Sequence, residues 1–96
     1  MVLGKKESHM FLVTANKGVH ITFANGYSLS IQWGQGNYCQ NRNIDVPYRS
    51  EVPASATAET AIIDPNGAFI EYNGNNVQGW QTPEQVAATM AYVAAL

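Results

Sequence analysis

Alternating apolar and polar residues along positions 19–33 predict a β-meander. In VHITF (19–23) every second residue is apolar, which places Val19, Ile21 and Phe23 on one face of a strand. ANG (24–26) is a hairpin signal. YSLSIQW (27–33) then alternates with apolar residues inward and serines outward, and the apolar run MFLVT (10–14) precedes it across a turn at ANKG (15–18). Three antiparallel strands with one apolar face are expected.

The pattern is lost over residues 34–55 and returns with a second hairpin. The irregular stretch contains two prolines and scattered Asn and Gln, and a loop of this length is typically functional or ordered by a partner. ATAETAIID (56–64) and AFIEY (68–72) are predicted strands. They flank DPNG (64–67), a turn with Pro second and Gly fourth, and NGNN (73–76) ends the second strand.

The C-terminal segment carries a helix start signal. Thr82 is the expected N-cap, Pro83 the first helical residue, and Gln85 completes a capping box. Val86, Met90 and Val93 then form one apolar stripe. The predicted fold is α+β: an antiparallel sheet of about five strands, a meander plus a hairpin, with one C-terminal α-helix packed on a sheet face. Residues 1–9 are expected to be a tag or a disordered leader, and residues 10–96 one domain.

Composition adds an expectation about assembly. Only 12% of the 96 residues are charged, against roughly 25% in an ordinary domain. A surface with so little charge is covered by neutral polar residues or is buried against another subunit, so we expect a homo-oligomer. Five basic residues are too few for the basic stripe that binds long nucleic acids. The chain has no run of 18 apolar residues for a membrane span, and its single cysteine fits a reducing cytoplasm.

Catalytic and metal chemistry have little support in the sequence. His9, His20 and Cys39 are too few soft ligands for a zinc site, and no pair of carboxylates stands out for acid–base work. Cys39 as a nucleophile would need a base, for which His20 is the candidate. A buried Cys39 that anchors the loop is the simpler interpretation. We therefore expect no catalytic residue, no metal, no cofactor and no enzymatic activity.

The stretch QWGQGNYCQNRN (32–43) is the candidate ligand site. Gly34-Gln35-Gly36 after a strand can expose backbone N–H groups to an anion, and Arg42 can form paired hydrogen bonds with a phosphate. Tyr38 or Trp33 can stack on a flat group, and the asparagines can read polar edges. The alternative is a tight turn whose Asn side chains cap the loop's own backbone. The candidate ligand-binding residues are Trp33, Gly36, Asn37, Tyr38, Asn41, Arg42 and Asn43.

Three segments together resemble a family of small phage and prophage proteins. They are NKGVHITFANGYSLSIQWGQGNYCQNRN, ATAETAIIDPNGAFI and GWQTPEQVAATMAYV. Members of this family begin with an NKG…TF-NG strand pair, continue into a GNYC-x-NR motif and end with a short helix. The motif falls on Gly36, Asn37, Tyr38, Cys39, Asn41 and Arg42, with Gln40 at the variable position.

The resemblance implies a phage protein acting in the host cytosol. The leading hypothesis is an anti-defence factor, a sponge that sequesters a nucleotide-derived immune signal at the GNYCQNR loop. Arg42 would contact phosphate, Tyr38 or Trp33 would stack, and the asparagines would orient polar groups. The alternatives are an inhibitor that binds a host defence protein through the 34–55 segment or a sheet edge, and a phage accessory or structural protein without a ligand.

Overall fold

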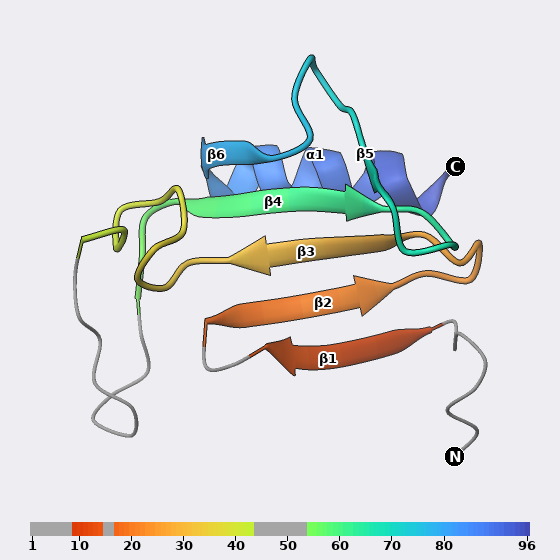
Figure 1. The fold of residues 1–96 in the computed structure, drawn as a ribbon, viewed down its shortest axis with the longest axis horizontal. Helices are drawn as coiled ribbons and strands as arrows, with labels where there is room; N and C mark the ends of the chain where they lie inside the picture. The colour runs from red at the N-terminus through yellow and green to blue at the C-terminus, as the bar shows by residue number, and fades with distance from the viewer. Residues whose placement is uncertain (1–8, 15–16, 44–53) are drawn as a thin grey trace.

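The computed structural model describes residues 9–14, 17–43 and 54–96, which form one antiparallel sheet and one helix (Figure 1). The strands are β1 (Met10–Thr14), β2 (Gly18–Thr22), β3 (Ser28–Gln32), β4 (Ala58–Ile63), β5 (Phe69–Ile70) and β6 (Gln78–Gln81). The helix, α1, spans Pro83–Ala94. The expected leader, apart from His9, and positions 44–53 of the irregular segment lie outside the described residues.

The sheet runs in the order β1-β2-β3-β4, and β5 and β6 share the far side of β4. Phe11, Ile21, Leu29 and Ile62 lie in one register row, so the apolar positions of four strands face the same side. Asn25, in the turn between β2 and β3, donates hydrogen bonds from its side chain to the carbonyls of Val93 (2.9 Å) and Leu96 (3.0 Å). This turn therefore holds the C-terminal end of α1 against the sheet.

The core lies under α1, which packs on β3, β4 and β6. Leu29 and Val93 are fully buried, and Ile31, Ala58 and Ile62 complete the buried cluster. In Figure 1 the helix runs behind the upper strands, and no helix lies behind β1 and β2. In the described part of the chain, α1 therefore covers the apolar face over β3 and β4, and no described element covers it over β1 and β2.

The predicted α+β class, the meander and the terminal helix are confirmed. Thr82 caps α1, and both bonds of the predicted capping box are present: the Gln85 N–H donates to the Thr82 hydroxyl, and the Thr82 N–H donates to the Gln85 side chain. The DPNG turn closes with a hydrogen bond from the Gly67 N–H to the Asp64 carbonyl. These elements depend on neighbouring residues alone, which is why the local pattern predicts them.

Two features differ from the sequence prediction. A sixth strand, β6, forms from QGWQ, which has no alternating pattern and exists because its backbone pairs with β4. Ser28 and Ser30 are buried although their positions in the alternation predict an outward face. Ser30 lies in β3 with a strand on either side, paired with His20 of β2 and Ala61 of β4, and these neighbouring strands shield so small a side chain. Ser28 forms a 2.8 Å hydrogen bond with Thr22.

Candidate functional site

The loop from Gly34 to Asn43 folds back on itself through main-chain hydrogen bonds. The Gly36 N–H donates to the Arg42 carbonyl (2.9 Å), and the Arg42 N–H donates to the Cys39 carbonyl (3.0 Å). Gly36 has a φ of +86°, a conformation that residues with a side chain rarely adopt. The glycine and the crossing hydrogen bonds together give the loop a defined shape.

Cys39 and Asn41 are the buried residues that anchor this loop. The Cys39 thiol lies 3.7 Å from the Gly34 carbonyl and is almost completely buried, so the prediction of a buried Cys39 is confirmed. The Asn41 amide nitrogen donates to the carbonyls of Trp33 (2.9 Å) and Ala54 (3.0 Å). Asn41 thereby joins the two ends of the irregular segment, next to β3 on one side and β4 on the other.

Asn37 and Glu59 tie the loop to the sheet. The Asn37 side chain accepts a hydrogen bond from the Gly34 N–H (3.0 Å) and donates to the Glu59 carboxylate (3.2 Å). The other oxygen of that carboxylate accepts from the Tyr38 N–H (3.0 Å). Gln40 makes a similar connection further along, because its side chain accepts from the Ala56 N–H and its own N–H donates to Thr57.

A bulge in β6 places Trp80 beside this loop. Thr60 pairs with Gln78 and Ala58 with Gln81, so two residues of β6, Gly79 and Trp80, face the single residue Glu59 of β4. Trp80 accordingly has a φ of +49°, which is unusual for a large side chain. Its N–H donates to the Tyr38 carbonyl (2.8 Å). The main chain of Tyr38 is therefore fixed between Glu59 of β4 and Trp80 of β6.

Tyr38, Trp80 and Arg42 form an exposed surface that we call the aromatic platform. The Tyr38 and Trp80 rings lie 5.6 Å apart between centroids and are tilted by 39°. The Arg42 guanidinium stands 4.2 Å from the centroid of the Tyr38 ring, in cation–π geometry, and donates to the Gly36 carbonyl (3.1 Å). Both rings remain about half exposed, at 43% for Tyr38 and 54% for Trp80. Two aromatic rings and one cation are thus presented to solvent from a fixed backbone.

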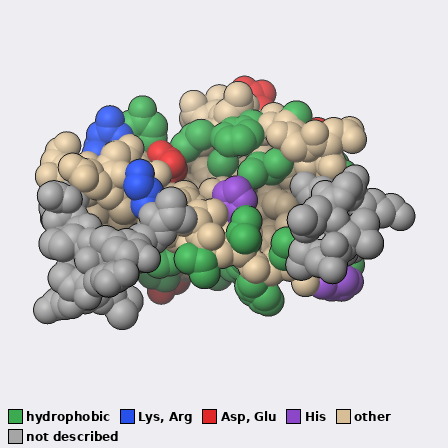
Figure 2. Space-filling model, turned by 60° about the horizontal axis from the view of Figure 1, so that its bottom comes forward, with side chains coloured by type: hydrophobic (Ala, Val, Ile, Leu, Met, Phe, Trp, Pro, Cys, Tyr) green, Lys and Arg blue, Asp and Glu red, His purple; other side chains and the backbone are tan. Residues whose placement is uncertain are grey.

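The positive charge of the described part of the chain gathers at this end of the molecule. Lys17 and Arg42 are its basic side chains, and Lys17 packs against Gly34 while Arg42 bonds to Gly36. In Figure 2 the basic side chains, in blue, lie together at one end of the visible face. An anion that approaches the platform therefore meets Arg42 of this loop and, from the neighbouring β1–β2 connection, Lys17.

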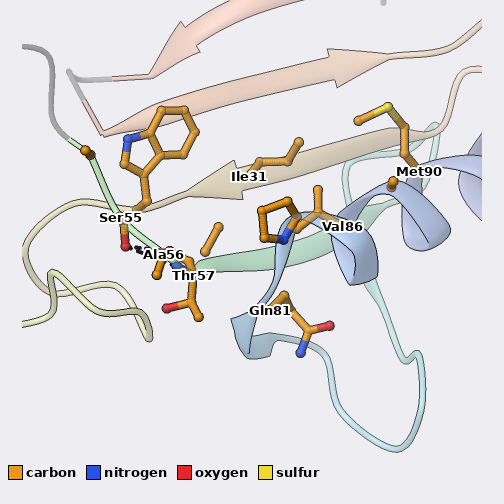
Figure 3. Close-up of a pocket in the computed structure, with 12 residues that line it drawn as sticks. Ile31, Ser55, Ala56, Thr57, Gln81, Val86 and Met90 are labelled. Carbon is orange, nitrogen blue, oxygen red and sulfur yellow. Dashed lines mark hydrogen bonds between the residues drawn. The ribbon is translucent and has the colours of Figure 1, made fainter.

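Trp33 belongs to a different surface. It lines a groove of about 450 Å³ between β3, α1 and residues 54–58, together with Ile31, Val86 and Met90 (Figure 3). The polar residues of this groove are Ser55, Thr57 and Gln81. The hydroxyl of Ser55 donates to the Thr57 carbonyl (2.6 Å). Trp33 therefore lies in the apolar lining next to the helix.

The structure places the seven predicted site residues in four different settings. Tyr38 and Arg42 come together on the platform, and Gly36 supports Arg42. Asn37 and Asn41 bond to the protein itself, and Trp33 lines the groove. Asn43 is exposed at the end of the described loop. Sequence reasoning missed Trp80 and Glu59, and the one available signal was the GW pair that interrupts the β6 segment.

The described residues contain neither a metal-binding cluster nor a membrane-spanning helix. Over these ranges, no three His, Cys, Asp or Glu side chains come close enough to hold a metal ion. In the same part of the chain, no helix has the length and apolarity needed to cross a bilayer.

Comparison with protein-family models, curated proteins and solved structures gives no match for this chain.

Proposed function

We propose that this protein is a non-enzymatic binding protein that captures a planar, anionic small molecule on the aromatic platform. The observation that carries the proposal is the exposed Tyr38–Trp80 ring pair with the Arg42 guanidinium beside it. Aromatic side chains on a surface stack on nucleobases, and each stacked base contributes roughly 1–3 kcal/mol. The exposed ring pair can stack on the base of a nucleotide, and the cation beside it can bind the phosphate.

Arg42 retains the donors that this role needs. A guanidinium carries five N–H donors in a planar fork, and the contact with the Gly36 carbonyl occupies one nitrogen. The rest of the fork can bind phosphate oxygens, and the nearby Lys17 adds a second positive charge. Because Tyr38 and Trp80 are fixed by main-chain hydrogen bonds, little conformational entropy is lost when a ligand stacks on them.

The hydrogen bonds of the asparagines show which loop residues are available to bind a ligand. The Asn41 amide group donates to the carbonyls of Trp33 and Ala54, and Asn37 bonds to Gly34 and Glu59. We therefore assign these two residues to holding the loop, and Tyr38, Trp80 and Arg42 to the ligand. Given the resemblance to small phage proteins, the ligand class we propose is a nucleotide-derived signal of host immunity, such as a cyclic dinucleotide or an ADP-ribose derivative.

Trp80 fluorescence provides a direct test. A Trp33→Phe variant leaves Trp80 as the sole tryptophan, since the chain contains two. Titration with cyclic dinucleotides and ADP-ribose should quench this fluorescence, while adenosine and ribose 5-phosphate measure the stacking and charge contributions separately. Loss of the Tyr38 ring in Tyr38→Ala should weaken binding about tenfold or more, from the value of one stacked base.

Tyr92→Ala is the matched control. Tyr92 is as exposed as Tyr38 (44% against 43%), and its ring also lies against a second aromatic ring, that of Tyr72, near the C-terminal end of α1. Its loss should leave the affinity unchanged. Equal losses for the two tyrosine variants, or no quenching by any nucleotide in the panel, would contradict the proposal.

A further inference from the structure

The outer edge of β1 is an open strand edge within the described part of the chain. There β1 pairs with β2 alone, so the backbone groups on its other side face no described strand. Edge strands in natural proteins are usually blocked by charged residues, proline or a bulge. MFLVT contains no charge and no proline, and its register with β2 runs through all five residues without a shift. This edge is competent to pair with another strand.

The sheet face beside this edge is apolar, and no element among residues 9–14, 17–43 and 54–96 covers it. Phe11 is 80% exposed and Val13 76% exposed, on the side of the sheet that α1 covers over β3 and β4. A groove of about 370 Å³ continues this surface to the end of the helix and is lined mainly by Phe11, Ile21, Phe23 and Ala94. Figure 2 brings the β1 edge of the sheet forward and shows hydrophobic side chains, in green, at this edge, while the face that α1 covers points away from the viewer. Exposed side chains of this kind are typical of an interface.

We propose that β1 pairs in antiparallel orientation with β1 of a second copy of this chain, around a twofold axis at Leu12. This register pairs all five residues: Met10 faces Thr14 of the second copy, Phe11 faces Val13, and Leu12 faces Leu12. Side chains at odd positions then share one face with their counterparts. Phe11 and Val13 of both copies form one apolar cluster across the junction.

A second copy fits this edge for two reasons. A twofold interface needs a surface that is complementary to itself, and an uninterrupted strand with apolar residues at both positions 11 and 13 meets that condition. The chain also has too few charged residues to repel another copy. The contact is small beside the roughly 800 Å² that each partner buries in a standard interface, so a dimer with a micromolar dissociation constant is expected.

Each copy keeps its own aromatic platform in this dimer. The platform loop follows the end of β3 that lies next to the β1–β2 turn (Figure 1). A twofold axis through the middle of β1 places the two loops at opposite ends of the joined sheet. The proposed interface is therefore independent of the proposed ligand site, and either one can fail without the other.

Cross-linking through cysteine tests the register. Leu12→Cys places two thiols on directly opposed residues, whose separation in an antiparallel pair permits a disulfide. Under mild oxidation we expect a covalent dimer on a non-reducing gel. Phe69→Cys is the matched control, since Phe69 is equally exposed (53% against 52%) and lies on β5. Absence of a Leu12→Cys dimer, or equal cross-linking of the two variants, would overturn the proposal.

Mass in solution tests the interface without cysteine chemistry. Wild-type protein at tens of micromolar should show twice the 10.5 kDa of one chain by sedimentation. Leu12→Lys places like charges opposite each other and should raise the dissociation constant at least tenfold, whereas Phe69→Lys should not. A wild-type protein that sediments as a monomer overturns the proposal, and this holds also if its β1 strand pairs with a different protein. So does an unchanged dimer of Leu12→Lys.

Discussion

The two halves of the sheet share one backbone pattern but differ in what covers them. Over β3 and β4 the helix reduces the exposure of Leu29 and Val93 to zero, while over β1 the side chain of Phe11 stays in solvent. In both halves apolar residues occupy every second position on this face, Phe11 and Val13 in β1 and Leu29 and Ile31 in β3. Apolar residues at every second position therefore mark a sheet face that is suited to burial. How much of that face is buried depends on how many helices or strands are available to cover it. One twelve-residue helix covers only half of this sheet.

The sharpest way to test this contrast is to truncate one side chain in each half. Leu29→Ala removes a fully buried side chain and should lower the free energy of unfolding by about 3–5 kcal/mol. Phe11→Ala removes a larger side chain from solvent and should change the stability of the monomer by less than about 0.5 kcal/mol. Urea denaturation of both variants at low protein concentration measures the difference. Equal losses would mean that the β1 half is also buried in the isolated chain.

A second substitution separates the two halves at their boundary. Gly18 lies where β2 approaches β3, and an added Cβ would stand 1.9 Å from the Ile31 carbonyl oxygen. Gly18→Ala therefore forces the backbones apart and should destabilise the protein by roughly 3 kcal/mol. Hydrogen exchange should show that β1 and β2 lose protection before β4 does. Gly34→Ala serves for comparison, because its Cβ would stand 2.8 Å from the Cγ of Lys17, a milder clash than the one with a carbonyl oxygen at Gly18, and a larger loss there would contradict this reasoning.

The attachment of the helix to the covered half depends on Asn25. Its side chain donates to the Val93 and Leu96 carbonyls at the helix end and accepts from the Tyr27 N–H. Asn25→Ala should reduce stability by about 1–2 kcal/mol, because these carbonyls lose their partners. Thermal denaturation monitored by circular dichroism measures the loss. Asn66→Ala, in the exposed turn before β5, should have little effect, and similar losses at both positions would count against a specific role for Asn25.

The smallest expected effect is a gain within the covered half. The hydroxyl of Thr60 is buried and has no hydrogen-bond partner among the described residues. Thr60→Val keeps the shape of the side chain and removes this unsatisfied group, so it should raise the free energy of unfolding by about 1 kcal/mol. Thr89→Val is the comparison, since the Thr89 hydroxyl is bonded to the Gln85 carbonyl and its loss should not stabilise the protein. Equal effects at the two positions would mean that Thr60 has a partner in solution.

The sequence predicts the parts of this molecule that depend on near neighbours. The capping box spans Thr82 to Gln85, and the turn at Asp64 closes within three residues, so their signals are readable without the fold. The platform depends on distant partners. Trp80 meets Tyr38 because a bulge faces Glu59, and Glu59 lies 22 residues from the Asn37 that it holds. No pattern near Tyr38 indicates which strand will lie beside it.

Dependence on distant partners also explains why the sequence allows two roles for Asn37 and Asn41, binding a ligand or holding the loop's own backbone. An amide side chain offers the same donors and acceptors to a ligand and to a backbone carbonyl. The decision depends on whether the Ala54 carbonyl reaches Asn41, which is a property of the folded segment and not of residue types.

The unequal edges of the sheet determine how far an assembly can grow. One edge is the uninterrupted β1, while on the other side β4 is flanked by the two residues of β5 and the four residues of β6, with a bulge in the latter. Pairing of β1 with its counterpart uses the long edge of both molecules and leaves only short, interrupted edges facing outward. Growth therefore stops at two chains, so a strand that contains no charge and no proline can remain exposed in the monomer without seeding a fibre.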